Sequence, residues 1–102
     1  MTRPDVLSIA FSGEQVLRNA DAAFSRLQTA LAAPGPVAID CTALTAADLS
    51  FLQILIAARR TAVATGRELS VTATAKGALH STLCRAGIAV EDAAGFITFL
   101  AP

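Results

Sequence analysis

The stretch VAIDCTALTAADLSFLQILIAARRTAVATG, residues 37–66, contains the pattern of a strand, a loop and a helix. Its first five residues, Val37–Cys41, form a short and nearly continuous apolar run, which is typical of a strand covered on both faces. Asp48 is a good N-cap residue and predicts a helix that runs from there to about Ala64. We expect the helix to end at Gly66, because glycine adopts the left-handed conformation of helix ends without strain.

On the N-terminal side of this unit, the sequence predicts another strand and another helix. Val6–Phe11 is rich in β-forming residues and predicts a strand, and the short segment 14–17 predicts an extended piece or a loop. Asn19 predicts the N-cap of a helix that must stop by Pro34-Gly35-Pro36. The apolar positions of this helix repeat at helical spacing, and they are Phe24, Leu27 and Leu31.

On the C-terminal side, the alternation continues. Residues 68–73 alternate between apolar and polar side chains and predict a strand, and residues 77–86 predict a third helix with Leu79 and Leu83 on one face. Phe96–Leu100 predicts a last strand or a single helical turn. Strands that alternate with helices indicate an α/β domain with right-handed crossovers, and 102 residues are enough for one domain only.

The composition excludes several classes of protein. The formal net charge is zero, 54% of the residues are apolar, and Trp and Tyr are absent. Intrinsic disorder requires the opposite balance, and a nucleic-acid-binding face requires a basic surface with stacking aromatic residues. The longest apolar run is much shorter than the roughly 18 residues of a membrane span, and no signal-peptide core follows the N-terminus. We therefore expect a cytoplasmic domain that neither binds nucleic acid nor inserts into a membrane.

The middle helix carries more apolar residues than one face can hold. Between Leu49 and Ile56, six of the eight positions are apolar, and at about 100° per residue they surround the helix axis. If Leu52 and Ile56 face the sheet, Phe51 and Ile54 have to point elsewhere. Neighbouring elements of the chain offer one cover for them. The alternative is an exposed apolar patch, which is typical of a protein–protein contact.

Metal and catalytic sites are not indicated by the sequence. Cys41, Cys84 and the single histidine, His80, are too few and too scattered for a structural zinc site, and the two cysteines are expected to be buried reduced thiols. Asp40 and Asp48 flank one loop, where a turn residue and a helix cap explain them. We expect no enzyme, no cofactor and no metal.

Three segments together resemble the STAS domain family, the anti-sigma factor antagonists. The first is 40–52, where a strand ends in Asp40 and a second aspartate, Asp48, opens a helix eight residues later. The second is 64–71, a helix-end glycine followed by a strand, and the third is 83–88, a leucine-rich turn that meets Gly and Ile. The resemblance implies a small mixed β-sheet covered by about three helices, with the usual C-terminal helix reduced or absent after about residue 88.

The resemblance also implies a non-enzymatic switch module. In family members that antagonise anti-sigma factors, a kinase phosphorylates a Ser or Thr directly after the second aspartate, and a glycine stands two positions later. In this sequence those positions hold Leu49 and Phe51, and Ser50 comes one residue late. We therefore expect docking without phosphorylation at the usual position. Ser50 as a displaced phospho-acceptor is the alternative.

The resemblance thus predicts a protein-interaction module of a bacterial signalling system. The expected partner is a histidine-kinase-like anti-sigma factor or a chemosensory protein, and a second copy of the chain is an alternative at the flank of the sheet after Ile88. The expected contact residues lie at the N-terminal end of the central helix, and they are Asp48, Leu49, Ser50, Phe51 and Ile54. A STAS subunit of a phospholipid-transport complex is a further alternative.

Overall fold

The computed structural model describes residues 6–33, 35–74, 77–88 and 97–100. Its elements follow in the order β1 (Leu7–Gln15), η1 (Leu17–Asn19, a 3-10 turn), α1 (Ala20–Ala32), β2 (Val37–Ala47), α2 (Leu49–Ala64), β3 (Leu69–Thr74), α3 (Ala78–Arg85) and β4 (Ile97–Leu100). The expected α/β class with three α-helices is confirmed. Of the segment that predicted a strand or a helical turn, Phe96 lies outside the described residues and Ile97–Leu100 is a strand. The expectation that the C-terminal helix is reduced falls largely on residues 89–96 and 101–102, which lie outside the described residues.

The four strands form one sheet in the order β1-β2-β3-β4. Each neighbouring pair is parallel, as in the pairings Leu7↔Val37, Val37↔Leu69 and Val71↔Ile97. The resemblance implied a mixed sheet, so the described strands are more uniform in direction than expected. The register of β1 against β2 shifts on both sides of Gly13, whose φ of 66° is accessible to glycine.

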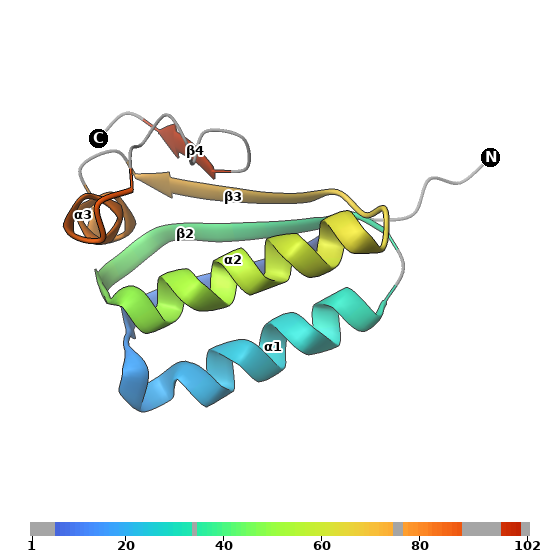
Figure 1. Ribbon diagram of the computed structural model, residues 1–102, viewed down its shortest axis with the longest axis horizontal. Coiled ribbons are helices and arrows are strands. Elements are labelled where there is room, and N and C mark those ends of the chain that lie inside the picture. Colours follow the sequence, from blue (N-terminus) through green and yellow to red (C-terminus); the bar gives the residue numbers. More distant parts are fainter. Residues whose placement is uncertain (1–5, 34, 75–76, 89–96, 101–102) are drawn as a thin grey trace.

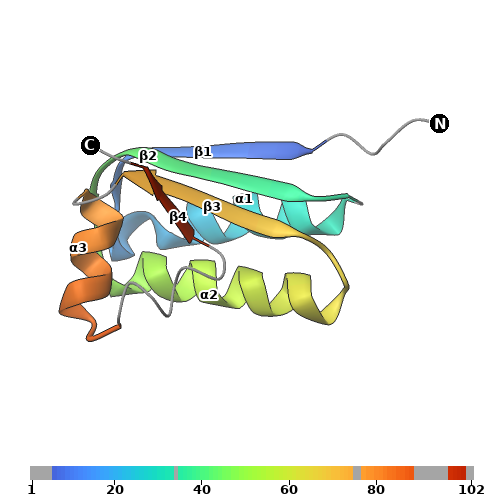
Figure 2. The same cartoon turned by 90° about the horizontal axis from the view of Figure 1, so that it is seen from above.

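Helices α1 and α2 lie side by side on one face of this sheet, and α3 stands at its end (Figures 1 and 2). The core between the helices and the sheet includes an edge-to-face pair of Phe11 and Phe51, with ring centroids 5.2 Å apart. Further fully buried side chains fill the layer around this pair, and they are Leu27, Val37, Ile39, Leu52, Leu55, Val71 and Ile97. Leu79 and Leu83 of α3 are buried as expected.

The opposite face of the sheet is polar, which corrects the prediction for β2. Burial alternates along the first half of that strand: Val37, Ile39 and Cys41 are buried, whereas Asp40 and Thr42 are exposed. The strand was expected to be covered on both faces and to end near Cys41. In the described structure it is covered on one face and continues to Ala47, because small and polar residues tolerate water on the second face.

Local interactions explain where the helices begin and end. Asp48 caps α2 as predicted, and Gly66 follows the helix with a φ of 71°. Asn19 is the N-cap residue of α1 by position, but its side chain does not cap that helix and bonds the preceding turn instead. The C-terminal end of α1 is fixed by Arg67, whose guanidinium donates hydrogen bonds to the carbonyls of Leu31 and Gly35.

Candidate functional site

Three connections meet at one edge of the sheet. In a parallel sheet, the carboxyl ends of all strands lie at the same edge. The turn η1 follows β1 there, α2 begins after β2, and α3 lies beside the end of β2 (Figure 1). The start of α2 therefore lies between segments that are distant in the sequence.

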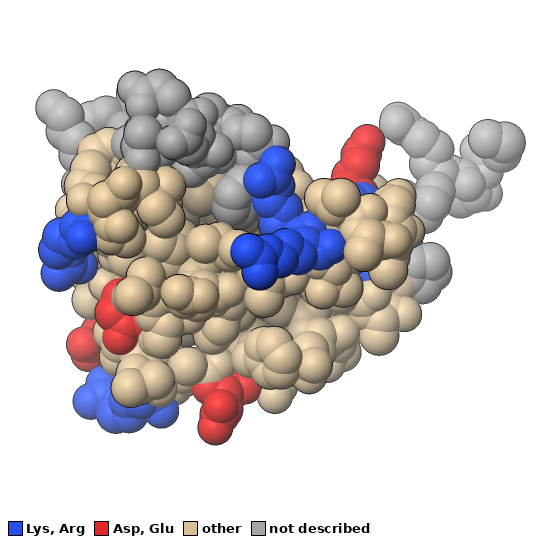
Figure 3. Space-filling view, in the orientation of Figure 1, with Lys and Arg blue, Asp and Glu red and all other residues tan. Residues whose placement is uncertain are grey.

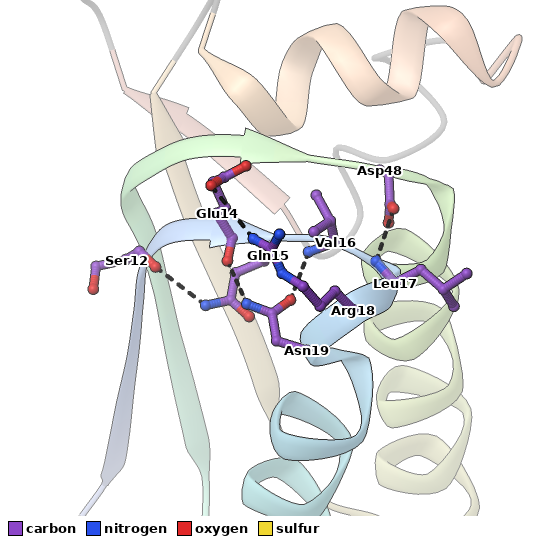
Figure 4. A network of polar contacts seen from close by, with 8 residues as sticks. All are labelled: Ser12, Glu14, Gln15, Val16, Leu17, Arg18, Asn19 and Asp48. Carbon is purple, nitrogen blue, oxygen red and sulfur yellow. Dashed lines mark hydrogen bonds and ion pairs between the residues drawn. The ribbon is translucent and has the colours of Figure 1, made fainter.

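The Asp48 carboxylate connects two of these segments. Its Oδ1 accepts hydrogen bonds from the Phe51 backbone N–H, at 3.3 Å, and from the Ser50 hydroxyl. Its Oδ2 accepts a hydrogen bond from the Leu17 backbone N–H at 2.9 Å, as Figure 4 shows. These bonds, led by the one from Ser50, hold the pKa of Asp48 below its ordinary value. The carboxylate is thus charged at neutral pH and occupied by donors from its own chain.

The turn η1 is held in place by its own polar contacts. The Asn19 side chain accepts from the Val16 N–H at 2.8 Å and donates to the Glu14 carbonyl at 2.7 Å (Figure 4). An exposed ion pair between Arg18 and Glu14 lies beside them. As a result, the Leu17 side chain is held next to the start of α2 with 73% of its surface exposed.

On the other side, α3 is attached to the same region. The Thr82 hydroxyl donates to the Ala47 carbonyl at 3.0 Å, and the Arg85 guanidinium donates to the same carbonyl at 3.3 Å. A shallow hollow of about 210 Å³ lies between α2 and α3, and Leu49, Arg85 and Ala86 are among the residues that line it. Leu49 is 53% exposed. We call Leu17, Asp48, Leu49, Ser50 and Arg85 the α2 N-terminal patch.

Two of the expected contact residues lie outside this patch. Phe51 is only 1% exposed and packs on Phe11, so the expectation that its side chain faces a partner is wrong. Ile54 is half-buried and lines a groove between α1 and α2. Leu49 and Ile54 are about 140° apart around the helix axis, since successive residues turn by about 100°. The expected single edge from Asp48 to Ile54 is therefore two surfaces on opposite flanks of α2.

The structure also adds residues to the site that the sequence did not indicate. From the sequence, Leu17 was expected in an extended piece or a loop. Arg85 was expected near the end of the helix predicted over residues 77–86, with no contact role. Leu17 and Asp48 are joined by a bond across 31 positions of the chain, and no local pattern encodes such a contact. The available signal in the sequence was an apolar residue at the end of the segment 14–17, which follows a predicted strand.

The cysteines and the histidine form no obvious reactive centre. Cys41 is buried, and burial raises the pKa of its thiol to about 12. Cys84 is exposed, contrary to the expectation of two buried thiols, with its Sγ 3.9 Å from Nδ1 of His80. Within the described ranges, no group of three or more His, Cys, Asp or Glu residues comes together to bind a metal.

A protein-family model described as "Mlab, STAS domain" matches residues 2–97. The chain belongs to the STAS domain family. This confirms the resemblance of the three segments, and the fold agrees with it. No curated protein matches the chain.

STAS domains are in general non-enzymatic modules of protein–protein interaction. This STAS domain has Leu49 where the resemblance placed a phosphorylatable hydroxyl. In the part of the chain that the structure describes, no helix is long and apolar enough to cross a membrane.

Proposed function

We propose that this STAS domain is a non-enzymatic docking module of a bacterial signalling system that binds its partner through the α2 N-terminal patch without prior phosphorylation. The observation that carries this proposal is the exposed Leu49 at the first position of α2. An apolar side chain at that position presents a permanent contact, whereas a hydroxyl would present one that a kinase can remove.

The neighbouring residues support an apolar contact. Leu17 and Leu49 are both more than half exposed, and both adjoin Asp48. Leu49 also lines the shallow hollow beside α3, and exposed apolar side chains that lie together are typical of a protein–protein contact. Asp48 keeps the two leucines at a fixed spacing because it bonds the Leu17 backbone and caps the helix that begins with Leu49. The patch is therefore preorganised, which reduces the entropy lost on binding.

The geometry disfavours Ser50 as a displaced phospho-acceptor. Its hydroxyl already donates to Oδ1 of Asp48 and is partly buried. Phosphorylation would remove that donor and place about two negative charges beside a carboxylate that is ionised at neutral pH. Asp48 would then also lose the hydrogen bond from the Ser50 hydroxyl, which is the main cause of its lowered pKa. We infer that Ser50 supports the start of the helix.

The charge balance points to a partner recognised mainly by apolar contact. The formal net charge of the chain is zero, so long-range electrostatic steering contributes little to association. A cytoplasmic histidine-kinase-like anti-sigma factor or chemosensory protein fits this proposal. In the alternative function, as the STAS subunit of a phospholipid-transport complex, the chain would bind its neighbouring subunit through the same patch.

A substitution at Leu49 tests the docking surface. We expect Leu49→Glu to weaken binding at least about tenfold, because it buries a charge in an apolar contact. Glutamate in the first turn of a helix is favoured by the helix dipole, so the fold is retained. The measurement is a calorimetric titration against the histidine-kinase-like or chemosensory protein encoded beside this one. The matched control is Val63→Glu, a change at a valine that is 70% exposed at the other end of α2.

Equal affinities for the Leu49→Glu and wild-type proteins would refute the proposed surface. A separate experiment addresses Ser50: incubation with the partner kinase and ATP, followed by intact-mass measurement. We expect no added phosphate under conditions in which a control substrate is phosphorylated. One phosphate that disappears in the Ser50→Ala variant would establish the alternative instead.

A further inference from the structure

Strand β1 is the outermost strand of the sheet, and its outer edge is not paired with any other described strand (Figure 2). The Leu7 N–H donates to the Pro36 carbonyl at 3.0 Å, and the register against β2 is unbroken from Leu7 to Ala10. Successive residues of a strand direct their backbone N–H and C=O groups to opposite edges. The backbone groups of Leu7 and Ile9 therefore face β2, whereas those of Ser8 and Ala10 face outwards. An outer edge of this kind is a template on which another chain can add a strand.

The sequence of β1 makes its outer edge prone to pairing with another strand. Residues 6–12 read VLSIAFS and contain no charge, proline or glycine. Short segments of this kind, with high β-propensity and low charge, pair edge to edge and stack into extended sheets when they are exposed. Repulsion between copies gives little protection, because the formal net charge is zero and most of the face seen in Figure 3 is uncharged. The edge therefore depends on local protection.

Arg26 of α1 covers the outer edge of β1 at Ala10. Its guanidinium donates to the outward-facing Ala10 carbonyl at 2.9 Å, and the guanidinium carbon lies 4.6 Å from the centroid of the Phe11 ring. The cation–π contact holds the side chain in place, because Phe11 is itself buried and packs edge-to-face on Phe51. Arg26 thus occupies an acceptor that a pairing strand would need. It also places a charge at the edge, which strand addition would have to remove from water.

Two further carbonyls of β1 are occupied by side chains in the same way. The Gln15 side chain donates to the Ser12 carbonyl at 3.1 Å, and the Asn19 side chain donates to the Glu14 carbonyl at 2.7 Å (Figure 4). Both of these bonds are local, whereas Arg26 reaches β1 from another element and covers the part of the strand with a regular register. Removal of Arg26 alone would therefore reopen the regular part of the edge.

We propose that Arg26 is a gatekeeper, a residue that prevents β1 from pairing with β1 of a second copy of the chain. Identical uncharged edges can pair in antiparallel orientation around a two-fold axis, and the guanidinium on the Ala10 carbonyl blocks this contact in each copy. The edge is thus autoinhibited by the helix that follows it. The inference does not rest on the proposed function, because neither Arg26 nor β1 contributes a residue to the α2 N-terminal patch.

Replacement of Arg26 tests this role. Arg26→Met keeps an unbranched side chain beside the Phe11 ring but removes the donor and the charge, whereas Arg26→Lys retains both. Self-association is measured by sedimentation equilibrium, with circular dichroism to verify folding. We expect Arg26→Met to self-associate with a dissociation constant at least about tenfold lower than that of the wild type, and Arg26→Lys to behave like the wild type. The matched control is Arg60→Met, the same change at an exposed arginine of α2, which should leave self-association unchanged.

A second substitution identifies the surface that associates. Ser8→Pro removes an outward-facing N–H that makes no bond to β2, so strand addition is blocked while the sheet is retained. Ser8→Lys leaves the backbone unchanged and brings like charges together at the edge. We expect either change to suppress the association of Arg26→Met. In the associated Arg26→Met protein, the amides of Ser8 and Ala10 should exchange with solvent at least about tenfold more slowly than in the wild type, as NMR-detected hydrogen exchange would show.

Arg26→Ala is measured in parallel, so that a loss of folding in one variant does not decide the outcome. Folded Arg26→Met or Arg26→Ala protein that associates no more tightly than the wild type would overturn the inference. Association that both Ser8 substitutions leave unchanged, or amide exchange at Ser8 and Ala10 that does not slow, would overturn it as well, because the contact would then use another surface. None of these results bears on the α2 N-terminal patch, whose own test is the titration of the Leu49→Glu variant.

Discussion

Replacing Asp48 should separate its two structural roles. Asp48→Asn retains a good N-cap for α2, but the amide cannot accept from Ser50, Phe51 and Leu17 together, and an NH₂ group then faces one of the donors. Because Leu17 is exposed and water can replace the lost bond, we expect a cost of about 1 kcal/mol. Asp48→Ala also removes the cap, which adds about 1 kcal/mol. The free energy of unfolding should therefore be highest for the wild type, lower for Asp48→Asn and lowest for Asp48→Ala.

The assay is thermal and urea unfolding followed by circular dichroism. In a domain of this size, 1 kcal/mol shifts Tm by about 4–8 °C. Because the pKa of Asp48 is lowered in the folded state, its charge stabilises the fold above about pH 4, and this contribution is lost as the pH falls through the lowered value. The gap in stability between the wild type and Asp48→Asn should thus be full at about pH 7 and shrink towards about pH 3.

The matched control is Asp40→Asn. Asp40 is exposed, and among the described residues its carboxylate accepts hydrogen bonds only from the backbone and hydroxyl of Thr42, two residues away. Loss of the Asp40 carboxylate should lower the free energy of unfolding by less than loss of the Asp48 carboxylate, because Asp40 does not bond a distant segment of the chain. If Asp48→Asn unfolded like the wild type at neutral pH, or if its deficit did not change with pH, the carboxylate would not connect η1 to α2 and this reasoning would be wrong.

Three other changes have expected outcomes. Phe51→Leu removes the aromatic pair with Phe11 and should lower the free energy of unfolding by about 1–2 kcal/mol without changing partner affinity; urea unfolding and titration measure the two effects. A thiol reagent should label Cys84 rapidly and Cys41 only after denaturation, as mass spectrometry of digested protein would show; equal labelling of both in the folded protein would contradict the described burial. Arg67→Ala leaves the carbonyls at the end of α1 without their guanidinium donor and should lower the free energy of unfolding by about 1–3 kcal/mol. Thermal unfolding measures this loss, and a Tm equal to that of the wild type would show that water replaces these bonds.

The boundaries of α2 could be predicted because they depend on local chemistry. The sequence shows an aspartate before the helix and a glycine after it, and these residue types favour a helix start and a helix end. In the structure, Asp48 accepts a hydrogen bond from the N–H three residues later, and Gly66 has a positive φ. The second face of β2 could not be predicted in the same way. The run Val37–Cys41 is short, and alanine is compatible with a buried or an exposed position, so the pattern did not distinguish one covered face from two.

The orientation of α2 also required the fold. Its apolar residues surround the axis, and only the position of Phe11 on β1 determines that Phe51 points inwards. The bond between Leu17 and Asp48 likewise depends on two strand ends that meet at one edge of the sheet. The sequence predicted a contact region at the start of α2, and this stays a prediction. The fold decides which side chains of that region are accessible.

The parallel pairing of all the described strands has a consequence for how the chain folds. Leu7 must find Val37, and Val37 must find Leu69, each across a complete intervening helix. No two of these strands can pair as a hairpin, so a large loop-closure entropy is lost before the first ladder forms. We expect folding to be slow for a domain of this length and to be cooperative. The helices, whose contacts are local, would form first and bring the strands together.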